Sequence, residues 1–107
     1  MTDRELLELA AKAAGCDGLG QWDDKWNCLT DHEGWTFDPL NDDGDALRLA
    51  VKLSMCIAIE PQYGLVYATA PGWRVGMEPE EKIGNDPYAA TRRAIVRAAA
   101  EIGKEMK

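Results

Sequence analysis

The chain has 107 residues, of which 46% are hydrophobic, and this length and composition predict one globular domain over residues 1–107. Its 19 acidic and 12 basic side chains give a net charge of −7, which argues against general binding to DNA or RNA, because like charges repel at long range. Three widely spaced cysteines, a charged N-terminal segment and the lack of a long apolar run predict a cytoplasmic protein without a disulfide framework, signal peptide or membrane span.

Three segments combine a helix start signal with the helical spacing of apolar residues, and we expect helices at 3–14, 43–55 and 87–103. The residues expected to cap them are Thr2 with Glu5 as a capping box, Asp42 or Asp43, and Asp86 followed by Pro87. Gly15 and Gly103 are expected to end the first and third helices, because glycine readily adopts the left-handed conformation found there. The predicted buried stripes are Ala46, Leu49, Ala50, Leu53 and Ile57 in the second segment, and Tyr88, Thr91, Ile95, Ala98 and Ile102 in the third.

The segments between the helices predict short antiparallel strands. Segments 26–29 and 35–37 fit two short strands, with an irregular loop as the alternative because acidic residues and glycines surround them. The apolar run 56–59 fits a short strand that we expect to be buried. The clearest hairpin signal is at 65–69 and 73–77, which flank the turn sequence Ala70-Pro-Gly72. Residues 78–85 are expected to form an exposed polar loop. The predicted class is therefore α+β, a small, mainly antiparallel β-sheet layered with three helices.

Metal sites and common catalytic motifs have no support in the sequence. In an EF-hand loop with its glycine at Gly44, the required ligands would fall on Pro39 and Ala50, which cannot serve. His32, the only histidine, has Cys28 four residues before it, but two ligands do not complete a zinc site. No hydrolase triad or dinucleotide-binding loop is present, so we expect a non-enzymatic protein without cofactor or metal.

Arg93 and Arg97 lie one turn apart in the third predicted helix and admit two interpretations. They and Glu101 fit an ordinary row of solvated ion pairs. Alternatively, the two guanidinium groups, with Arg74, grip a phosphate or carboxylate.

Four tryptophans are many for a chain of this length. They either fill a core that contains a single phenylalanine, or lie partly exposed as stacking or interface anchors. The candidates for exposure are Trp22, Trp26 and Trp73, because their neighbours are polar or glycine.

The segments Asn41-Asp-Asp-Gly-Asp-Ala-Leu-Arg-Leu-Ala-Val-Lys-Leu53 and Asp86-Pro-Tyr-Ala-Ala-Thr-Arg-Arg-Ala-Ile-Val-Arg-Ala-Ala-Ala-Glu-Ile-Gly103 resemble the phage ABA sandwich family. The start of the first predicted helix resembles it more loosely, and residues 56–85 only in predicted topology. The resemblance implies an α-β-α sandwich encoded by a phage or prophage and acting in the host cytoplasm. It supplies no catalytic residues, because members of the family generally have no assigned activity.

Two functions follow as expectations. The first is an accessory binding protein that captures a host protein, for example in counter-defence, through an acidic surface. The second is a binding protein for a small nucleotide-like anion, with tryptophan for stacking and arginine for the charge. A homodimer or higher oligomer is also expected, since Trp22, Trp26, Leu29 and Trp73 are large apolar residues outside the helical stripes.

Overall fold

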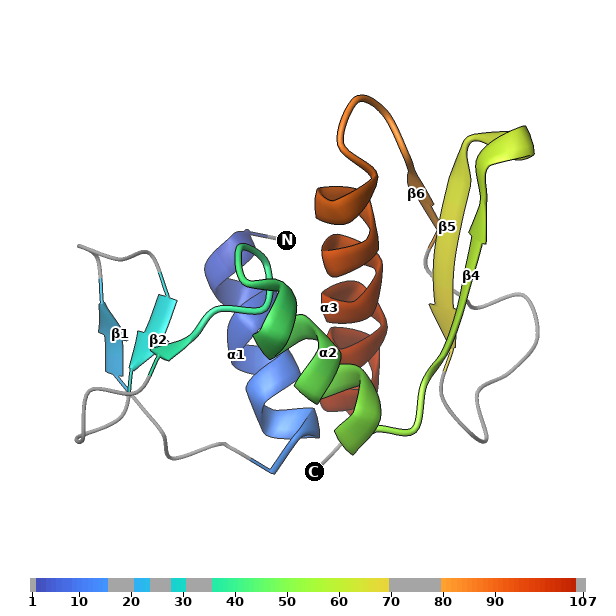
Figure 1. The fold of residues 1–107 in the computed structure, drawn as a ribbon. Coiled ribbons are helices and arrows are strands. Elements are labelled where there is room, and N and C mark those ends of the chain that lie inside the picture. The colour runs from blue at the N-terminus through green and yellow to red at the C-terminus, as the bar shows by residue number, and fades with distance from the viewer. Residues whose placement is uncertain (1, 16–20, 24–27, 31–35, 70–79, 106–107) are drawn as a thin grey trace.

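The computed structural model describes residues 2–15, 21–23, 28–30, 36–69 and 80–105. In it, three helices lie between two small antiparallel sheets (Figure 1). Helix α3 (Pro87–Glu105) packs on one face of the sheet β4-β5-β6, and α1 (Asp3–Ala13) and α2 (Asp43–Lys52) pack against α3. The sheet β1-β2-β3 lies beyond α1. The predicted α+β class, with three helices layered on an antiparallel sheet, is confirmed.

Helix α1 begins and ends as its local sequence predicts. The Thr2 hydroxyl accepts a hydrogen bond from the Glu5 amide at 3.1 Å, and the Glu5 carboxylate accepts one from the Thr2 amide at 3.3 Å. The Thr2 hydroxyl also donates to Glu5 Oε1 at 3.0 Å. The two hydrogen bonds that the carboxylate accepts, first that from the Thr2 amide and then that from the hydroxyl, lower the pKa of Glu5, because they favour its ionised form. Gly15 follows the helix with φ +76°, a left-handed conformation that glycine adopts without strain.

Helix α2 begins at Asp42, whose carboxylate accepts a hydrogen bond from the Asp45 amide at 2.8 Å. It ends three residues before the predicted boundary. There the chain makes a Schellman turn, in which the Met55 amide donates to the Ala50 carbonyl at 2.9 Å. Ser54 occupies the left-handed position of this turn with φ 54°, a conformation that the sequence pattern did not reveal.

Helix α3 is capped by Asp86, whose carboxylate accepts hydrogen bonds from the amides of Tyr88 at 3.0 Å and Ala89 at 3.1 Å. The prediction that Gly103 ends this helix is wrong, because the helix continues to Glu105. Gly103 is instead buried against α1. A Cβ atom at this position would lie 2.8 Å from the carbonyl carbon of Leu9, closer than carbon atoms pack. The glycine therefore permits the close approach of α1 and α3.

The sheet beside α3 consists of β4 (Cys56–Glu60), β5 (Leu65–Thr69) and β6 (Glu80–Lys82), with β5 in the centre and the 3-10 turn η1 (Pro61–Tyr63) between β4 and β5. The tight hairpin predicted for 65–77 would pair Leu65 with Met77, but Leu65 pairs with Lys82. The predicted hairpin is therefore wrong for the partners of residues 65–67, and the predicted loop is wrong for residues 80–82, which form β6. The charges of Glu80-Glu81-Lys82 suggested a loop, although charged residues also suit a strand at the edge of a sheet. Residues 73–77 lie outside the described residues.

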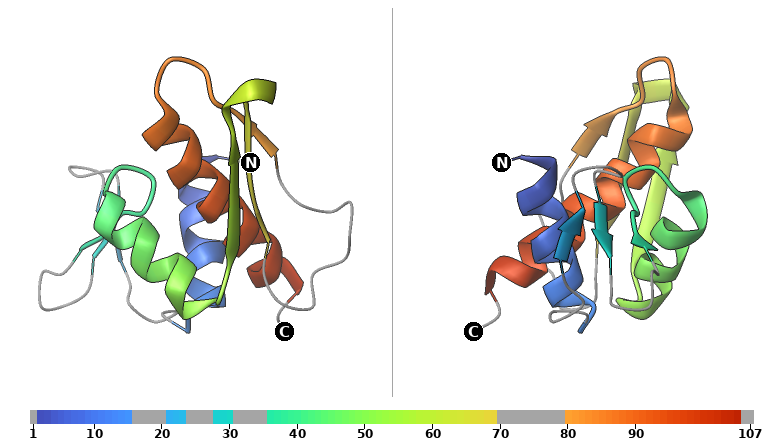
Figure 2. Two further views of the ribbon diagram at one scale, coloured as in Figure 1. Left: turned by 45° about the vertical axis from the view of Figure 1, so that its right-hand side comes forward. Right: turned by 90° about the vertical axis from the view of Figure 1, so that its left-hand side faces the viewer.

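The second sheet joins β1 (Gln21–Asp23), β2 (Cys28–Thr30) and β3 (Thr36–Phe37) in that order (Figure 2). Trp22 pairs with Leu29, and Leu29 with Phe37, in antiparallel register. The predicted strands 26–29 and 35–37 thus overlap β2 and β3 where the structure describes them, whereas β1 was not predicted.

The core lies between the three helices and β5, and small residues make up much of it. Its buried members are Leu6, Leu7, Ala10, Ala11, Ala14, Ala46, Leu49, Ala50, Val66, Ala68, Ala90, Ala94, Ile95, Val96, Ala98, Ala99 and Ala100. Two predicted core positions are wrong, because Tyr88 is 69% exposed and Ile57 is 37% exposed. Tyr88 lies in the first turn of α3, and Ile57 lies on the edge strand β4, beyond the main cover of α3.

Candidate functional site

The structure describes three of the six sequence-predicted site residues, and they lie on two elements, β1 and α3. Trp22 lies in β1, where it pairs with Leu29. Arg93 and Arg97 lie on α3, one turn apart. The remaining three, Trp26, Trp73 and Arg74, lie outside the described residues. Of the six, Arg93 and Arg97 have side-chain contacts in the described part of the chain.

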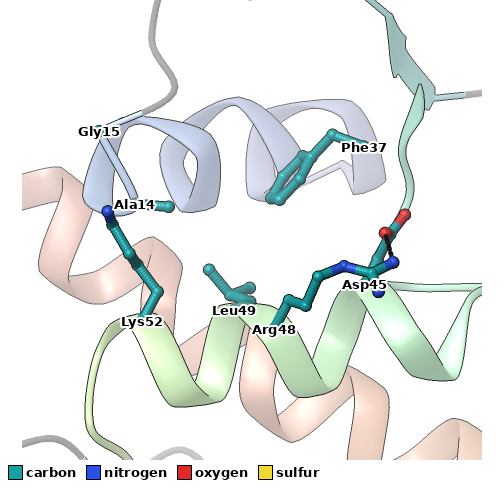
Figure 3. Close-up of a pocket in the computed structure, with 7 residues that line it drawn as sticks. All are labelled: Ala14, Gly15, Phe37, Asp45, Arg48, Leu49 and Lys52. Carbon is teal, nitrogen blue, oxygen red and sulfur yellow. Dashed lines mark hydrogen bonds and ion pairs between the residues drawn. The ribbon is translucent and has the colours of Figure 1, made fainter. Parts of the chain in front are cut away.

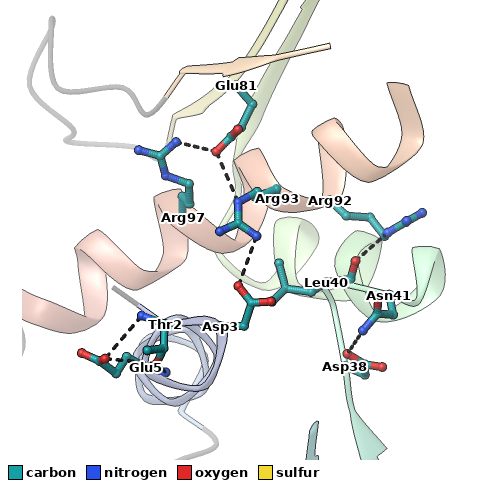
Figure 4. Close-up of polar contacts among 10 residues, drawn as sticks. All are labelled: Thr2, Asp3, Glu5, Asp38, Leu40, Asn41, Glu81, Arg92, Arg93 and Arg97. Carbon is teal, nitrogen blue, oxygen red and sulfur yellow. Dashed lines mark hydrogen bonds and ion pairs between the residues drawn. The ribbon is translucent and has the colours of Figure 1, made fainter. Parts of the chain in front are cut away.

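Both arginines bind carboxylates of the chain itself (Figure 4). Arg93 Nη1 lies 3.2 Å from Asp3 Oδ1, and its Nε lies 3.8 Å from Glu81 Oε1. Arg97 Nη1 donates a hydrogen bond to the same oxygen of Glu81. The Glu81 side chain is only 16% exposed, so this carboxylate needs its cationic partners. The pair joins α1 and β6 to α3, and an incoming anion at this place would compete with Glu81.

Arg92, which precedes Arg93 in the sequence, joins α3 to the start of α2 and to the segment before it. Its Nε donates to the Leu40 carbonyl at 2.9 Å, and its Nη1 lies 2.5 Å from Asp43 Oδ1. The Arg92 side chain is largely buried, with 17% of its surface exposed. Arg92, Arg93 and Arg97 thus have structural contacts that no local pattern in the sequence indicates, because their partners lie far away along the chain.

A cavity of about 340 Å³ lies between the end of α1, Phe37 at the end of β3, and one side of α2 (Figure 3). The residues that line it are Ala14, Gly15, Phe37, Asp45, Arg48, Leu49 and Lys52. The ring of Phe37 and the side chain of Leu49 provide its apolar part. Arg48 extends toward Asp45, and Lys52 extends toward the end of α1.

The polar groups of the cavity are connected to one another on one side. Asp45 Oδ1 lies 2.6 Å from Arg48 Nη2, and Asp45 Oδ2 accepts a hydrogen bond from the Asp38 amide at 3.0 Å. The bond with Asp45 raises the pKa of Arg48, so this side chain remains charged. Asp38 is half-buried, and burial, together with the carboxylates of Asp45 and Asp42, raises the pKa of its side chain. Lys52 makes no ion pair within the part of the chain that the structure describes.

Sequence reasoning missed this cavity. The i, i+3 spacing of Asp45 and Arg48 allows an ion pair on the surface of a helix, and the structure contains that pair. However, nothing in the local pattern showed that Phe37 lies beside them. The only available signal was the spacing of Arg48 and Lys52, which places two cations one turn apart on α2.

A second candidate surface is apolar, and we call it the α2-β4 apolar surface. It consists of Leu47 and Val51 on α2, which are 62% and 69% exposed, and Ile57 and Ile59 on β4, which are 37% and 53% exposed. Ile57 pairs with Ala68 and Ile59 with Val66, and both partners are buried.

Directly paired residues point to the same face of a sheet, so Ile57 and Ile59 lie on the face that carries the helices. They are nevertheless exposed, because α3 packs mainly on β5 and β6. The prediction that the run 56–59 forms a buried strand is therefore correct for the strand and wrong for its burial.

Within the described ranges, no helix is long and apolar enough to span a membrane. The same residues contain no cluster of three or more histidine, cysteine, aspartate or glutamate side chains placed to hold a metal ion. Comparison of the chain with protein-family models, curated proteins and solved structures gave no match.

Proposed function

We propose that the chain is a small accessory binding protein that captures a protein partner on the α2-β4 apolar surface. In keeping with the resemblance to the phage ABA sandwich family, the partner would be a host protein and the role would be counter-defence by a phage or prophage. The observation that supports binding here is the exposure of Ile57 and Ile59 on the helix-bearing face of the sheet.

Apolar side chains on the helix-bearing face of a sheet are normally covered. Burying a whole isoleucine side chain stabilises by roughly 1.5–3 kcal/mol, and Ile57 and Ile59 still expose 37% and 53% of their surface, which a partner could cover. Leu47 and Val51 are i, i+4 neighbours, so they extend the apolar area along α2. Exposed apolar side chains that gather on a surface are typical of interaction sites.

The edge of β4 also favours an interaction, because it lacks the features that usually protect such edges. Sheet edges are commonly protected by charged residues or proline, and β6, at the other edge, has the sequence Glu80-Glu81-Lys82. By contrast, β4 has the sequence Cys56-Ile-Ala-Ile-Glu60, and its single charged group, Glu60, accepts a hydrogen bond from the Tyr67 hydroxyl. An extended segment of the partner could therefore pair with the backbone of β4 while its side chains cover Ile57 and Ile59.

The net charge of −7 favours a basic partner, because complementary charge speeds encounter and disfavours other partners. A second copy of the chain carries the same charge and would be repelled. We therefore assign this surface to a different, basic protein. The homo-oligomer expected from the tryptophan-containing segments stays a separate prediction, which light scattering across micromolar concentrations tests.

The proposal is tested by affinity capture from bacterial lysate with the wild-type chain and the double variant Ile57→Lys, Ile59→Lys. Both positions are exposed, so the variant should fold, which circular dichroism checks. A partner of this surface should be captured by the wild type and by the control Glu8→Lys, but lost with the double variant. Glu8 lies on α1, on the other side of α3 from β4.

Hydrogen exchange of the captured complex then locates the contact. Protection should increase at the amides of β4, because a partner strand would bond to them. If the double variant retains the partner, or if protection appears elsewhere and not on β4, the proposed surface is wrong.

A further inference from the structure

We propose that the cavity between α1, Phe37 and α2 is a binding site for a small organic anion, with a single aromatic ring carrying one carboxylate as the fitting class. This inference is independent of the proposed function. The cavity is lined by Arg48 and Lys52, which lie on a different side of α2 from Leu47 and Val51.

The size and apolar part of the cavity favour a single ring. Its volume of about 340 Å³ is near the lower end of ligand sites, which span roughly 300–1,000 Å³. The Phe37 ring can stack on an aromatic ligand, and Leu49 and Ala14 supply aliphatic contacts. A dinucleotide would exceed this space, whereas a benzoate-sized molecule would fit within it.

The charges that line the cavity select an anion. Among the side chains that line the cavity, Arg48 and Lys52 are cations and Asp45 is an anion. Asp42, which is not part of the lining, lies 3.8 Å from Arg48 and offsets part of the positive charge, and the whole chain has a net charge of −7. A cationic ligand would therefore be attracted to the protein as a whole but not to this cavity. Because Lys52 makes no ion pair among the described residues, the cavity favours an anion over the rest of the acidic surface.

Arg48 is also held in position for such a ligand. Asp45 binds its Nη2 at 2.6 Å, and Asp45 itself is fixed by the Asp38 amide. Among the described residues, the ion pairs of Arg48 with Asp45 and Asp42 both use Nη2. The Nε and Nη1 groups are therefore available to donate hydrogen bonds to a carboxylate.

The test compares benzoate with benzylamine, two molecules of similar shape and opposite charge, at constant ionic strength and neutral pH. Titrations are followed by amide chemical shifts in two-dimensional NMR spectra. Benzoate should shift the amides of 14–15, 37 and 45–52 in a saturable manner at millimolar concentrations, and benzylamine should not.

Variants then assign the contacts. Arg48→Gln and Lys52→Gln should each weaken benzoate binding by about fivefold, as expected for partly exposed charge-assisted contacts. Phe37→Leu, which keeps an apolar side chain but removes the ring, should also weaken it. The control Arg4→Gln removes an exposed cation of α1 that is paired with Glu8 and should leave the affinity unchanged.

The NMR spectra also show whether each variant is folded, so a loss of binding can be separated from a loss of structure. The proposal is overturned if benzoate causes no saturable shifts at these amides, or if benzylamine binds equally well. It is also overturned if the double variant Arg48→Gln, Lys52→Gln binds benzoate as tightly as the wild type.

Discussion

Replacing Gly103 by alanine should destabilise the protein although alanine favours helices. The new Cβ atom would lie 2.8 Å from the carbonyl carbon of Leu9 and 3.2 Å from its Cα atom. Carbon atoms in contact are separated by roughly 3.5–4.0 Å, so the last turns of α3 must move away from α1 by about 0.7 Å or more. The obstacle is the backbone of α1, which cannot rotate aside as a side chain can.

The expected magnitude combines two opposing effects. Overpacking at a buried position costs about 1–3 kcal/mol. The higher helix propensity of alanine offsets up to about 1 kcal/mol of this loss. The net loss should be about 1–2 kcal/mol, which lowers the melting temperature by roughly 5–10 °C for a domain of this size.

Urea denaturation of the wild type, Gly103→Ala and a matched control measures this difference. The control is Gly44→Ala in α2, where a Cβ atom would meet only side-chain atoms of Asp42 and Arg48, at 3.2–3.4 Å. These contacts are relieved by shifts of a few tenths of an ångström in exposed side chains, with the Asp42 cap kept in place, so the control should stay within about 1 kcal/mol of the wild type. Equal effects of the two substitutions on the free energy of unfolding would refute the close-packing argument.

Three further substitutions test other contacts. The double variant Arg93→Ala, Arg97→Ala should lower the free energy of unfolding by about 1–3 kcal/mol, because the mostly buried Glu81 loses its partners. Adding Glu81→Gln should restore part of this loss. A double variant as stable as the wild type would contradict the role of these ion pairs. Ser54→Gly should stabilise the protein by roughly 0.5–1 kcal/mol in thermal denaturation, because residue 54 has φ 54°; an unchanged melting temperature would argue against this conformation. Asp38→Asn should stabilise the protein at pH 7, because burial raises the pKa of Asp38 and the wild type loses stability as pH rises through that pKa. The gain over the wild type should shrink toward pH 4 in urea titrations, and a gain that is independent of pH would exclude ionisation as its cause.

Local signals in the sequence were sufficient to predict where each helix begins. The caps at Thr2, Asp42 and Asp86 act within three residues, so their partners are visible in the sequence itself. Helix ends were less predictable. Ser54 adopts a left-handed conformation without being glycine, and Gly103 serves the packing of two helices and does not end one.

Features that depend on distant partners could not be predicted. The charged strand β6 pairs with β5. Its Glu81 side chain is held by Arg97 of α3, a residue 16 positions further along the chain. The exposure of Ile57 depends on which strand becomes the edge of the sheet. Likewise, the cavity beside Arg48 forms only when Phe37 is brought to α2.

The packing of α1 on α3 also has a consequence for synthesis on the ribosome. Asp3 and Arg93, which join the two helices, are 90 residues apart. At translation rates of roughly 5–20 residues per second, α1 waits about 5–18 s before this partner is made. During that time Leu6, Leu7, Ala10 and Ala11 lack the helix that buries them. The nascent chain therefore passes through a stage in which its first helix is open to chaperones and proteases.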